Sequence, residues 1–335
     1  MRYSYGKRAA TLAVLGALVA TFATTSSAGA GPSAAERARA EHNRIVSFWT
    51  PARVAKAVPR DFVYDPTSRT FKPAAAATSS TTTGTSWLGG GEALDATGKV
   101  LFAMGTSYYV CSASVADDTV SGRSIILTAA HCAYDEAKKA FATNWIFVPR
   151  YDAAPARLTA SGSFCAYTSL GCWTASSLVV HQGYADAGGF TTQATTHDFA
   201  FAVVGAGGKS GTAQLDATVG GHPINFNSVA NGADAYLFGY PSSGKYKGND
   251  LVYCRGPLST DPYNAGLTYR VGCNMTGGSS GGPWLTPFSS GSGTLMSVNS
   301  YVYSGVTAMH GPKLNAKTQA LFTAATTATT NTIVG

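Results

Sequence analysis

Charged residues are scarce in this chain of 335 residues: Asp, Glu, Lys and Arg together make up 12% of it, whereas 45% is hydrophobic. Long stretches with helical periodicity are also scarce, and glycine is abundant, with 38 residues. This much apolar material can fill a sizeable core in one large domain or two small ones. The many turn residues between short apolar runs favour an all-β chain.

The excess of positive charge is confined to the beginning of the chain. Residues 1–84 hold 11 Lys/Arg against 4 Asp/Glu and so carry the whole formal charge of +7. Residues 85–335 hold 13 of each sign and sum to zero. We therefore expect no nucleic-acid binding by the main part of the chain.

Only the N-terminus has a long apolar run. Arg2, Lys7 and Arg8 precede "AATLAVLGALVATFA", and the small residues "AGA" at 28–30 offer a cleavage site. The run is shorter than the roughly 20 residues that a membrane span requires. We expect a signal peptide over residues 1–30 and a secreted, extracellular protein with no membrane association after signal removal. A membrane anchor is the alternative.

Residues 31–86 differ in composition from the rest of the chain. Ser33, with Glu36 three residues later, forms a capping-box pattern ahead of a short helix. A basic, proline-punctuated stretch comes next, and residues 74–86 are a low-complexity run typical of a flexible, exposed linker. We predict a propeptide and linker over 31–86 and a single main domain over 87–335. A small N-terminal arm that the mature protein retains is the alternative.

The six cysteines all lie after this leader, and no C-x-x-C pair typical of metal sites occurs. An even number of cysteines in an exported protein favours disulfides. Fifteen pairings are possible, and the simplest joins neighbours in sequence: Cys111 with Cys132, Cys165 with Cys172, and Cys254 with Cys273. No acidic cluster indicates calcium, and we expect no metal or cofactor.

Short apolar strands broken by turns fill the region from about residue 87. The candidate strands are 99–104, 108–115, 124–129, 144–149, 176–181, 199–204, 234–240, 250–254, 267–271 and 293–303. Such a series is typical of β-barrels or a sandwich. One helix is expected after Pro312.

Three motifs could carry chemistry: "ILTAAHC" at 126–132, "HDFAFAVV" at 197–204 and "GGSSGGPW" at 277–284. Taken singly, each motif also has a non-catalytic interpretation. The histidine could be structural, the aspartate a solvated turn residue, and the serine motif a flexible loop. A serine hydroxyl becomes a nucleophile only with a base and with donors for the oxyanion. The glycines around the two serines allow positive φ and close approach of a substrate.

Together, in the order His, Asp, Ser, the motifs resemble those of the chymotrypsin-like (trypsin-like) secreted serine peptidase family over about residues 95–325. The family's "TAAHC" is present at 128–132, and its G-D-S-G-G-P signature corresponds to residues 278–283. Its acid motif is matched at 197–200, and the stretch ahead of that acid at 179–184. The resemblance implies two packed six-stranded Greek-key β-barrels with a C-terminal helix.

The resemblance also implies a role for each motif residue. Ser280 is the nucleophile, His131 the general base and acid, and Asp198 the group that orients the imidazole. The backbone N–H groups of Gly278 and Ser280 form the oxyanion hole. The substrates are polypeptides, and we expect a monomer.

Ser279 departs from the family pattern, because most members carry an aspartate at this place. In many animal members that aspartate binds a freed N-terminal ammonium on activation. We therefore expect maturation by removal or release of the propeptide without such an insertion switch. This is closer to bacterial and fungal secreted members, including those similar to glutamyl endopeptidases.

For specificity, the family's pocket floor lies six residues before the nucleophile, at Asn274, which disfavours a basic P1 residue. The pocket wall corresponds to 298–303, with Ser300 and Tyr301 in the substrate-binding strand. His310 is expected at the surface, and the P1 preference stays open.

Two other function classes fit less well. A catalytically inactive binding protein on the same scaffold usually lacks a triad member, whereas this chain keeps all three. In a serine esterase or lipase the usual G-x-S-x-G elbow needs a strand–turn–helix context and the order Ser, Asp, His. This context and this order are both absent here.

Overall fold

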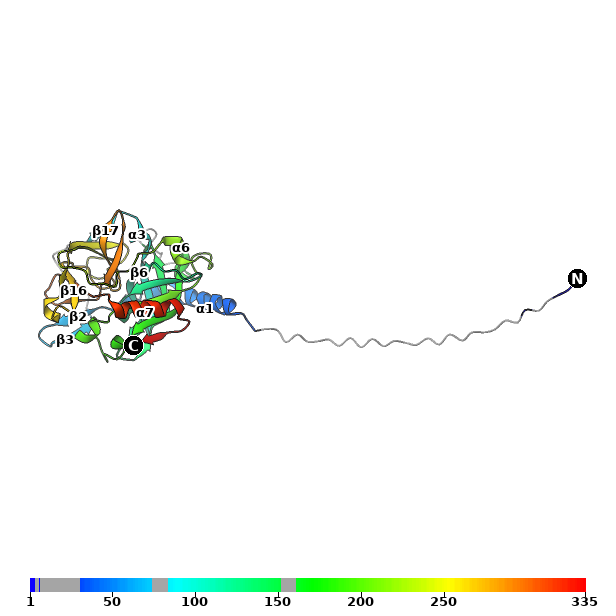
Figure 1. Ribbon diagram of the computed structural model, residues 1–335, viewed down its shortest axis with the longest axis horizontal. Coiled ribbons are helices and arrows are strands. Elements are labelled where there is room, and N and C mark those ends of the chain that lie inside the picture. Colours follow the sequence, from blue (N-terminus) through cyan, green and yellow to red (C-terminus); the bar gives the residue numbers. More distant parts are fainter. Residues whose placement is uncertain (4–5, 7–30, 74–83, 152–160) are drawn as a thin grey trace. The chain divides into compact units, whose positions relative to one another are not determined.

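The computed structural model describes residues 1–3, 6, 31–73, 84–151 and 161–335 (Figure 1). The chain divides into two units, Met1–Ser33 and Ala34–Gly335, and the folded elements belong to the second. Nearly all of the predicted signal peptide and residues 74–83 of the predicted linker lie outside the described residues. Within the described ranges, no helix has the length and apolar character to cross a membrane.

The first barrel is a closed ring of six antiparallel strands. Its order is β6-β5-β10-β11-β12-β7, and β7 pairs back onto β6. The strands are β5 (Thr97–Met104), β6 (Ser107–Ala116), β7 (Ser124–Thr128), β10 (Thr143–Pro149), β11 (Trp173–His181) and β12 (Ala200–Val204). Strands β5, β7 and β12 are buried along their whole length. Their near-continuous apolar runs follow from having one side inside the barrel and the other covered by neighbouring elements.

The second barrel consists of two hydrogen-bonded sheets that pack over a separate core. Its six main strands are β13 (Asp234–Gly239), β14 (Val252–Pro257), β16 (Thr268–Val271), β17 (Pro283–Ser289), β18 (Ser292–Val298) and β20 (Met309–Pro312). Leu237, Trp284 and Met296 lie in the core between the sheets. The Ser297 hydroxyl donates to the Pro312 carbonyl at 2.7 Å and joins β18 to β20.

The C-terminal helix α7 (Ala316–Thr327) begins with a capping box between Asn315 and Thr318 and packs on β11 and β12. Its red ribbon lies across the first barrel in Figure 1. The predicted all-β architecture, with two six-stranded barrels and a C-terminal helix, is confirmed.

Shorter elements connect and flank these strands. They are α2 (Pro51–Val54), α3 (Glu92–Asp95), η1 (Ala130–Cys132), β8 (Tyr134–Asp135), β9 (Ala140–Phe141), η3 (Phe164–Tyr167), α4 (Gln182–Ala185), α5 (Thr192–Thr195), α6 (Leu215–Val219), β15 (Ser259–Thr260), η4 (Pro262–Asn264), β19 (Tyr301–Tyr303) and β21 (Thr332–Val334).

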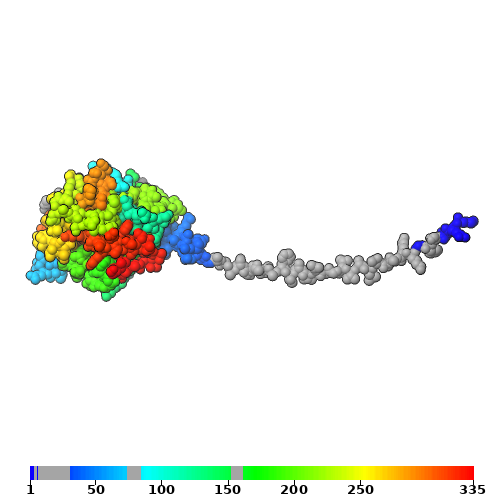
Figure 2. Space-filling view, in the orientation of Figure 1, coloured from blue at the N-terminus to red at the C-terminus, as the bar shows by residue number. Residues whose placement is uncertain are grey.

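The predicted propeptide contributes ordered structure on both barrels. Helix α1 (Ala34–Phe48) follows Ser33, as predicted, and packs on β10 and β11 of the first barrel. Strand β1 (Val58–Pro59) pairs with β6, while β2 (Phe62–Asp65) pairs with β19 and with β3 (Thr70–Pro73). In Figure 2 the light-blue atoms of this part lie beside yellow atoms from the second half of the chain.

The last three residues of the predicted flexible linker have a different structure. Strand β4 (Thr85–Ser86) pairs with β14, and Gly84 before it is buried. Thr85 and Ser86 do keep exposed side chains. The composition of 74–86 predicts a linker throughout. The free edge of β14, however, provides hydrogen-bond partners for the backbone of residues 85–86.

The six cysteines form three disulfides: Cys111–Cys132, Cys165–Cys172 and Cys254–Cys273. This is the pairing of sequence neighbours that the cysteine spacing predicts.

Candidate active site

His131 and Asp198 are brought together by the pairing of β7 with β12. His131 lies on the turn η1 directly after β7, and Asp198 lies just before β12. In the register of these strands Ala200 is opposite Thr128, so the two flanking segments meet at the same barrel edge. Both side chains are fully buried.

The Asp198 carboxylate holds both the backbone and the ring of His131. Its Oδ1 accepts from the His131 backbone N–H at 2.9 Å, and its Oδ2 lies 2.8 Å from Nδ1. A carboxylate at this distance favours a proton on Nδ1, which leaves Nε2 with its lone pair. Among the described residues Nε2 has no hydrogen-bond partner. The arrangement gives the imidazole a free nitrogen that can accept a proton.

The glycines around the two serines are required by close packing. Gly278 has φ +97° and Gly281 has φ +80°. A Cβ at Gly281 would lie 2.1 Å from Thr128 Oγ1. The loop is also fixed to β6, because the Ser112 N–H donates to the Ser280 carbonyl at 2.7 Å and the Ser112 hydroxyl donates to the Gly278 carbonyl at 2.9 Å.

The two adjacent serines have different partners. The Ser279 hydroxyl donates to the Thr276 carbonyl at 2.9 Å, within its own turn. The Ser280 hydroxyl donates instead to Asp61 Oδ1 at 2.5 Å, and Asp61 lies close enough to His131 to interact electrostatically with it. Of the two hydroxyls, only that of Ser280 shares Asp61 as a neighbour with the imidazole.

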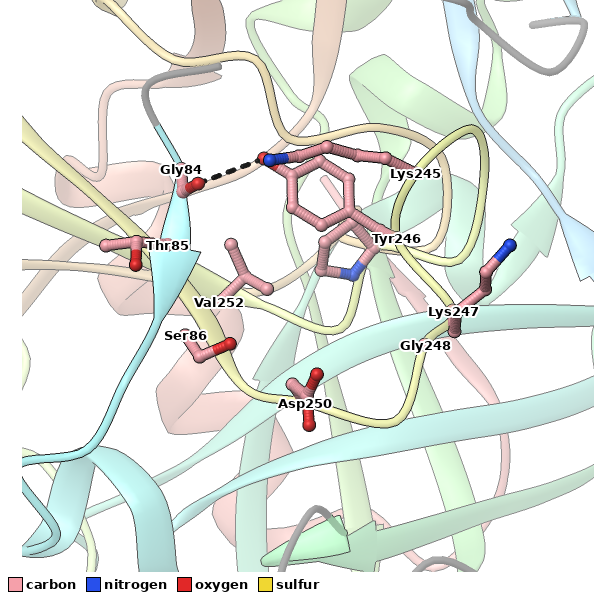
Figure 3. Close-up of a pocket in the computed structure, with 10 residues that line it drawn as sticks. Gly84, Thr85, Ser86, Lys245, Tyr246, Lys247, Gly248, Asp250 and Val252 are labelled. Atoms are coloured by element: carbon pink, nitrogen blue, oxygen red, sulfur yellow. Dashed lines mark hydrogen bonds between the residues drawn. The ribbon is translucent and has the colours of Figure 1, made fainter.

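Asn274, the predicted pocket floor, is a meeting point of three segments. Its Oδ1 accepts from the Gly84 N–H at 3.1 Å and from the Tyr246 hydroxyl at 2.9 Å. The Tyr246 hydroxyl also donates to the Gly84 carbonyl at 3.4 Å, and both residues line a pocket of about 280 Å³ together with Lys245 and Asp250 (Figure 3). The amide oxygen of the floor is thus engaged by two residues that line this pocket.

Ser300 directly precedes strand β19 and Tyr301 begins it, but their side chains point to different partners. The Ser300 hydroxyl donates to Asp198 Oδ2 at 2.5 Å, a contact that the motifs did not predict. The Tyr301 hydroxyl donates to Asp261 Oδ2 at 2.7 Å. Of this predicted pair of substrate-binding residues, Ser300 directs its side chain to the carboxylate beside His131.

The prediction that His310 lies at the surface is wrong. It is fully buried, and its ring stacks on that of Tyr301 with 5.0 Å between centroids. The cause is the position of β20, which pairs with β16 on one side and with β19 on the other. Burial lowers the pKa of His310 to about 4.

Asp261 was not identified from the sequence, although it is fully buried beneath β19. It accepts hydrogen bonds from the Tyr301 and Tyr303 hydroxyls and from the Tyr263 N–H. Burial, with Asp261 nearby, raises the pKa of both Tyr301 and Tyr303 well above the usual range. The one available signal was the Asp-Pro pair at 261–262, which is typical of a turn and not of a buried network.

Potential metal ligands gather at one place in the described part of the chain, where Cys111, His131 and Cys132 lie together. Both sulfur atoms are joined in a disulfide, so this group offers no thiolate.

Comparison with known proteins finds no matching family model and no matching curated protein. Several solved structures are similar. Protease Anisep from Arthrobacter nicotinovorans is 36% identical, with a TM-score of 0.58 over 70% of this chain and 96% of that one. The thermostable serine protease AL20 from an extremophilic microorganism is 33% identical, with a TM-score of 0.58 over 71% of this chain and 100% of that one.

A Glu endopeptidase shares the fold at 18% identity and a TM-score of 0.53, over 75% of this chain and 100% of that one. The identity to the first two proteases, over nearly their whole length, agrees with the two barrels and with the motifs at their junction. The chain belongs to the chymotrypsin-like serine peptidase family.

Proposed function

We propose that the chain is a secreted serine endopeptidase that cleaves peptide bonds with His131, Asp198 and Ser280 through an acyl-enzyme intermediate. The observation that carries this proposal is the pairing of His131 Nδ1 with Asp198 at 2.8 Å, which leaves Nε2 without a hydrogen-bond partner among the described residues. A catalytic base needs this arrangement of an oriented ring and an available nitrogen.

In the proposed reaction Ser280 Oγ attacks the scissile carbonyl while His131 Nε2 takes its proton. The same nitrogen then gives the proton to the leaving amine, and a water molecule repeats the sequence on the acyl-enzyme. Asp198 stabilises the imidazolium and stays ionised. The N–H groups of Gly278 and Ser280 donate to the oxyanion of the tetrahedral intermediate. The nucleophile, the base, the carboxylate and the two oxyanion donors all belong to the chain itself.

The proposal includes export and processing. Residues 1–30 act as a signal peptide, 31–86 as a propeptide and linker, and 87–335 as the catalytic domain, active as a monomer. Three disulfides support an oxidising compartment. Sequencing the N-terminus of the secreted protein tests the division: we expect a start beyond residue 73, and a retained start at Gly31 would contradict it.

Covalent labelling by a fluorophosphonate tests the chemistry. The probe is applied to the processed protein from the culture medium, and hydrolysis of a peptide ester is followed in parallel. Ser280→Ala should abolish both signals, whereas the matched control Ser279→Ala should keep both. Processed wild-type protein that takes up no label would favour the inactive binding protein instead.

A further inference from the structure

We propose that residues 58–73, called here the blocking segment, are an inhibitor of the active site carried by the chain itself, with the Asp61 carboxylate in the place of the reaction's oxyanion. The inference rests on the proposed function, because it assigns an occupant to the same catalytic centre.

The Asp61 carboxylate engages the nucleophile and one oxyanion donor at once. Its Oδ1 accepts from the Ser280 hydroxyl at 2.5 Å, and its Oδ2 accepts from the Gly278 N–H at 2.9 Å. The proton that Ser280 would give to His131 is thereby directed to Asp61. Asp61 is partly exposed as a residue, but its carboxylate is directed at the buried Ser280. A negative oxygen close to Gly278 N–H is what an oxyanion hole stabilises.

The backbone of the blocking segment occupies the edge of β19, the strand predicted to bind substrate. Strand β2 adds in parallel to β19, with Phe62 opposite Tyr301 and Tyr64 opposite Tyr303. The Ser304 N–H extends this ladder by donating to the Tyr64 carbonyl at 3.0 Å. Addition of a strand to a free sheet edge is a common mode of peptide binding. With β2 in place, a substrate peptide has no access to this edge.

Aromatic rings of the blocking segment cover the imidazole. The Phe62 ring meets that of His131 edge-on, with 5.6 Å between centroids, and stacks on Phe190 at 4.0 Å. Phe71 packs edge-on against both Phe190 and Tyr301. With these rings in place the His131 side chain is fully buried. Catalysis requires access of substrate to this histidine, so the cover must leave before reaction.

Arg60 anchors the segment beside the catalytic residues. Its side chain is 11% exposed, and the guanidinium donates to the His131 carbonyl at 2.6 Å and forms an ion pair with Glu136 at 3.1 Å. The Tyr184 hydroxyl donates to the same Glu136 carboxylate at 2.8 Å. Removing one partner of a largely buried ion pair leaves the other charge buried without compensation, which costs free energy.

The nucleophile loop itself fits the segment closely. A Cβ at Gly277 would lie 2.7 Å from Pro59 Cβ and 2.8 Å from Asp61 Oδ2. Only glycine permits this approach, so the loop and the segment are complementary in shape as well as in charge. A cut beyond residue 73 would leave all of these contacts in place, so we expect the cleaved segment to inhibit until it dissociates or is degraded.

The rate of fluorophosphonate labelling of the intact chain tests the inference. Intact and processed forms are separated on a gel, so that label on the full-length form is read alone. We expect the wild-type intact chain to label slowly and Asp61→Ala to raise this rate about tenfold or more, because it removes hydrogen bonds to a charged group. Loss of intact Asp61→Ala chain by self-cleavage counts as the same result.

Asp65→Ala is the matched control. Asp65 lies in the same blocking segment, but its carboxylate bonds to Lys72 and to the turn at 67–68, away from Ser280. We expect it to label like the wild type. Processed enzyme from the Asp61→Ala chain should label at the wild-type rate, which shows that the domain has folded.

A synthetic peptide of residues 31–73 gives a second readout with processed enzyme. The wild-type peptide should inhibit competitively, and the peptide with Asp61→Ala should inhibit about tenfold more weakly or worse. An intact chain that labels as fast as processed enzyme, or peptides of equal potency, would overturn this inference alone. Absence of label on every form would instead overturn the proposed function.

Discussion

The Ser300 hydroxyl donates to Asp198 Oδ2 at 2.5 Å, so one carboxylate is shared by a residue of each barrel. Asp198 precedes β12 of the first barrel, and Ser300 precedes β19, whose partner β20 belongs to the second. With the two bonds from His131, the carboxylate has three donors. Three hydrogen bonds fix its orientation toward the imidazole.

Ser300→Ala should lower kcat while leaving KM for a small ester nearly unchanged, because Ser300 positions Asp198 and its hydroxyl need not touch the substrate. The loss of a hydrogen bond to a charged group predicts a fall of about tenfold. Processed enzyme is assayed for kcat and KM separately, because a positioning role changes kcat while KM stays nearly constant. Ser300→Thr should restore most of the activity. An unchanged kcat would exclude the positioning role.

Binding of the 31–73 peptide to processed enzyme should strengthen in acid. Burial raises the pKa of Asp61 in the docked state, although the Ser280 hydroxyl, His131, the Gly278 N–H and Arg60 act against the rise. A docked pKa above that of the free peptide means that docking takes up protons. Affinity is therefore greatest below the free value and declines as the pH rises through the docked value.

Fluorescence anisotropy at about pH 5 and pH 8 measures this dependence directly, without relying on turnover. The matched peptide with Asp61→Asn isolates the contribution of the carboxyl group. Its affinity should change less between the two pH values than that of the wild-type peptide. Equal changes would remove Asp61 from the explanation.

Removal of the Cys111–Cys132 disulfide should destabilise the first barrel. The bridge closes a loop with a sequence separation of 21 residues, which corresponds to about 3 kcal/mol in the chain-entropy model. Urea unfolding of the full chain with Ser280→Ala, which prevents self-digestion, gives the free energy of unfolding with and without the pair. Replacing Cys165 and Cys172, only 7 residues apart, should cost less. A reversed order would contradict the loop-length argument.

Lys99 should make the chain less stable at neutral pH than at alkaline pH. It is 7% exposed, and burial lowers its pKa to about 7. The unfolded chain then binds more protons than the folded chain between that value and the ordinary lysine pKa. The free energy of unfolding therefore rises with pH across this window, by at most about 1.4 kcal/mol per unit. The ring of Tyr151, 4.1 Å from Nζ, favours the charged form and reduces the slope.

Lys99→Met keeps the length of the side chain and removes its charge. In the same Ser280→Ala background it should be more stable than its parent near pH 6, and the advantage should shrink toward pH 9. Urea unfolding at both pH values measures the difference. A constant difference would show that Lys99 does not change its protonation on folding.

The amino-acid sequence by itself determined most of the strands, the C-terminal helix and the three catalytic candidates, whereas β17 and β20 lay outside the candidate ranges. Alternating or continuous apolar runs report local backbone geometry, and the motifs around His131 and Ser280 are contiguous stretches whose glycines and cysteines act on their own turns. The disulfides follow the same logic, since each joins neighbouring cysteines.

Tertiary structure alone decided which carboxylates and hydroxyls meet. Asp61 and Ser280 are 219 residues apart in sequence, and Ser300 and Asp198 are 102 apart. No local pattern marks such pairs, because they depend on how the two barrels pack together and on which free strand edge pairs with the blocking segment. His310 was misplaced for the same reason, since pairing of β20 on both sides buries a residue that sequence alone places at the surface.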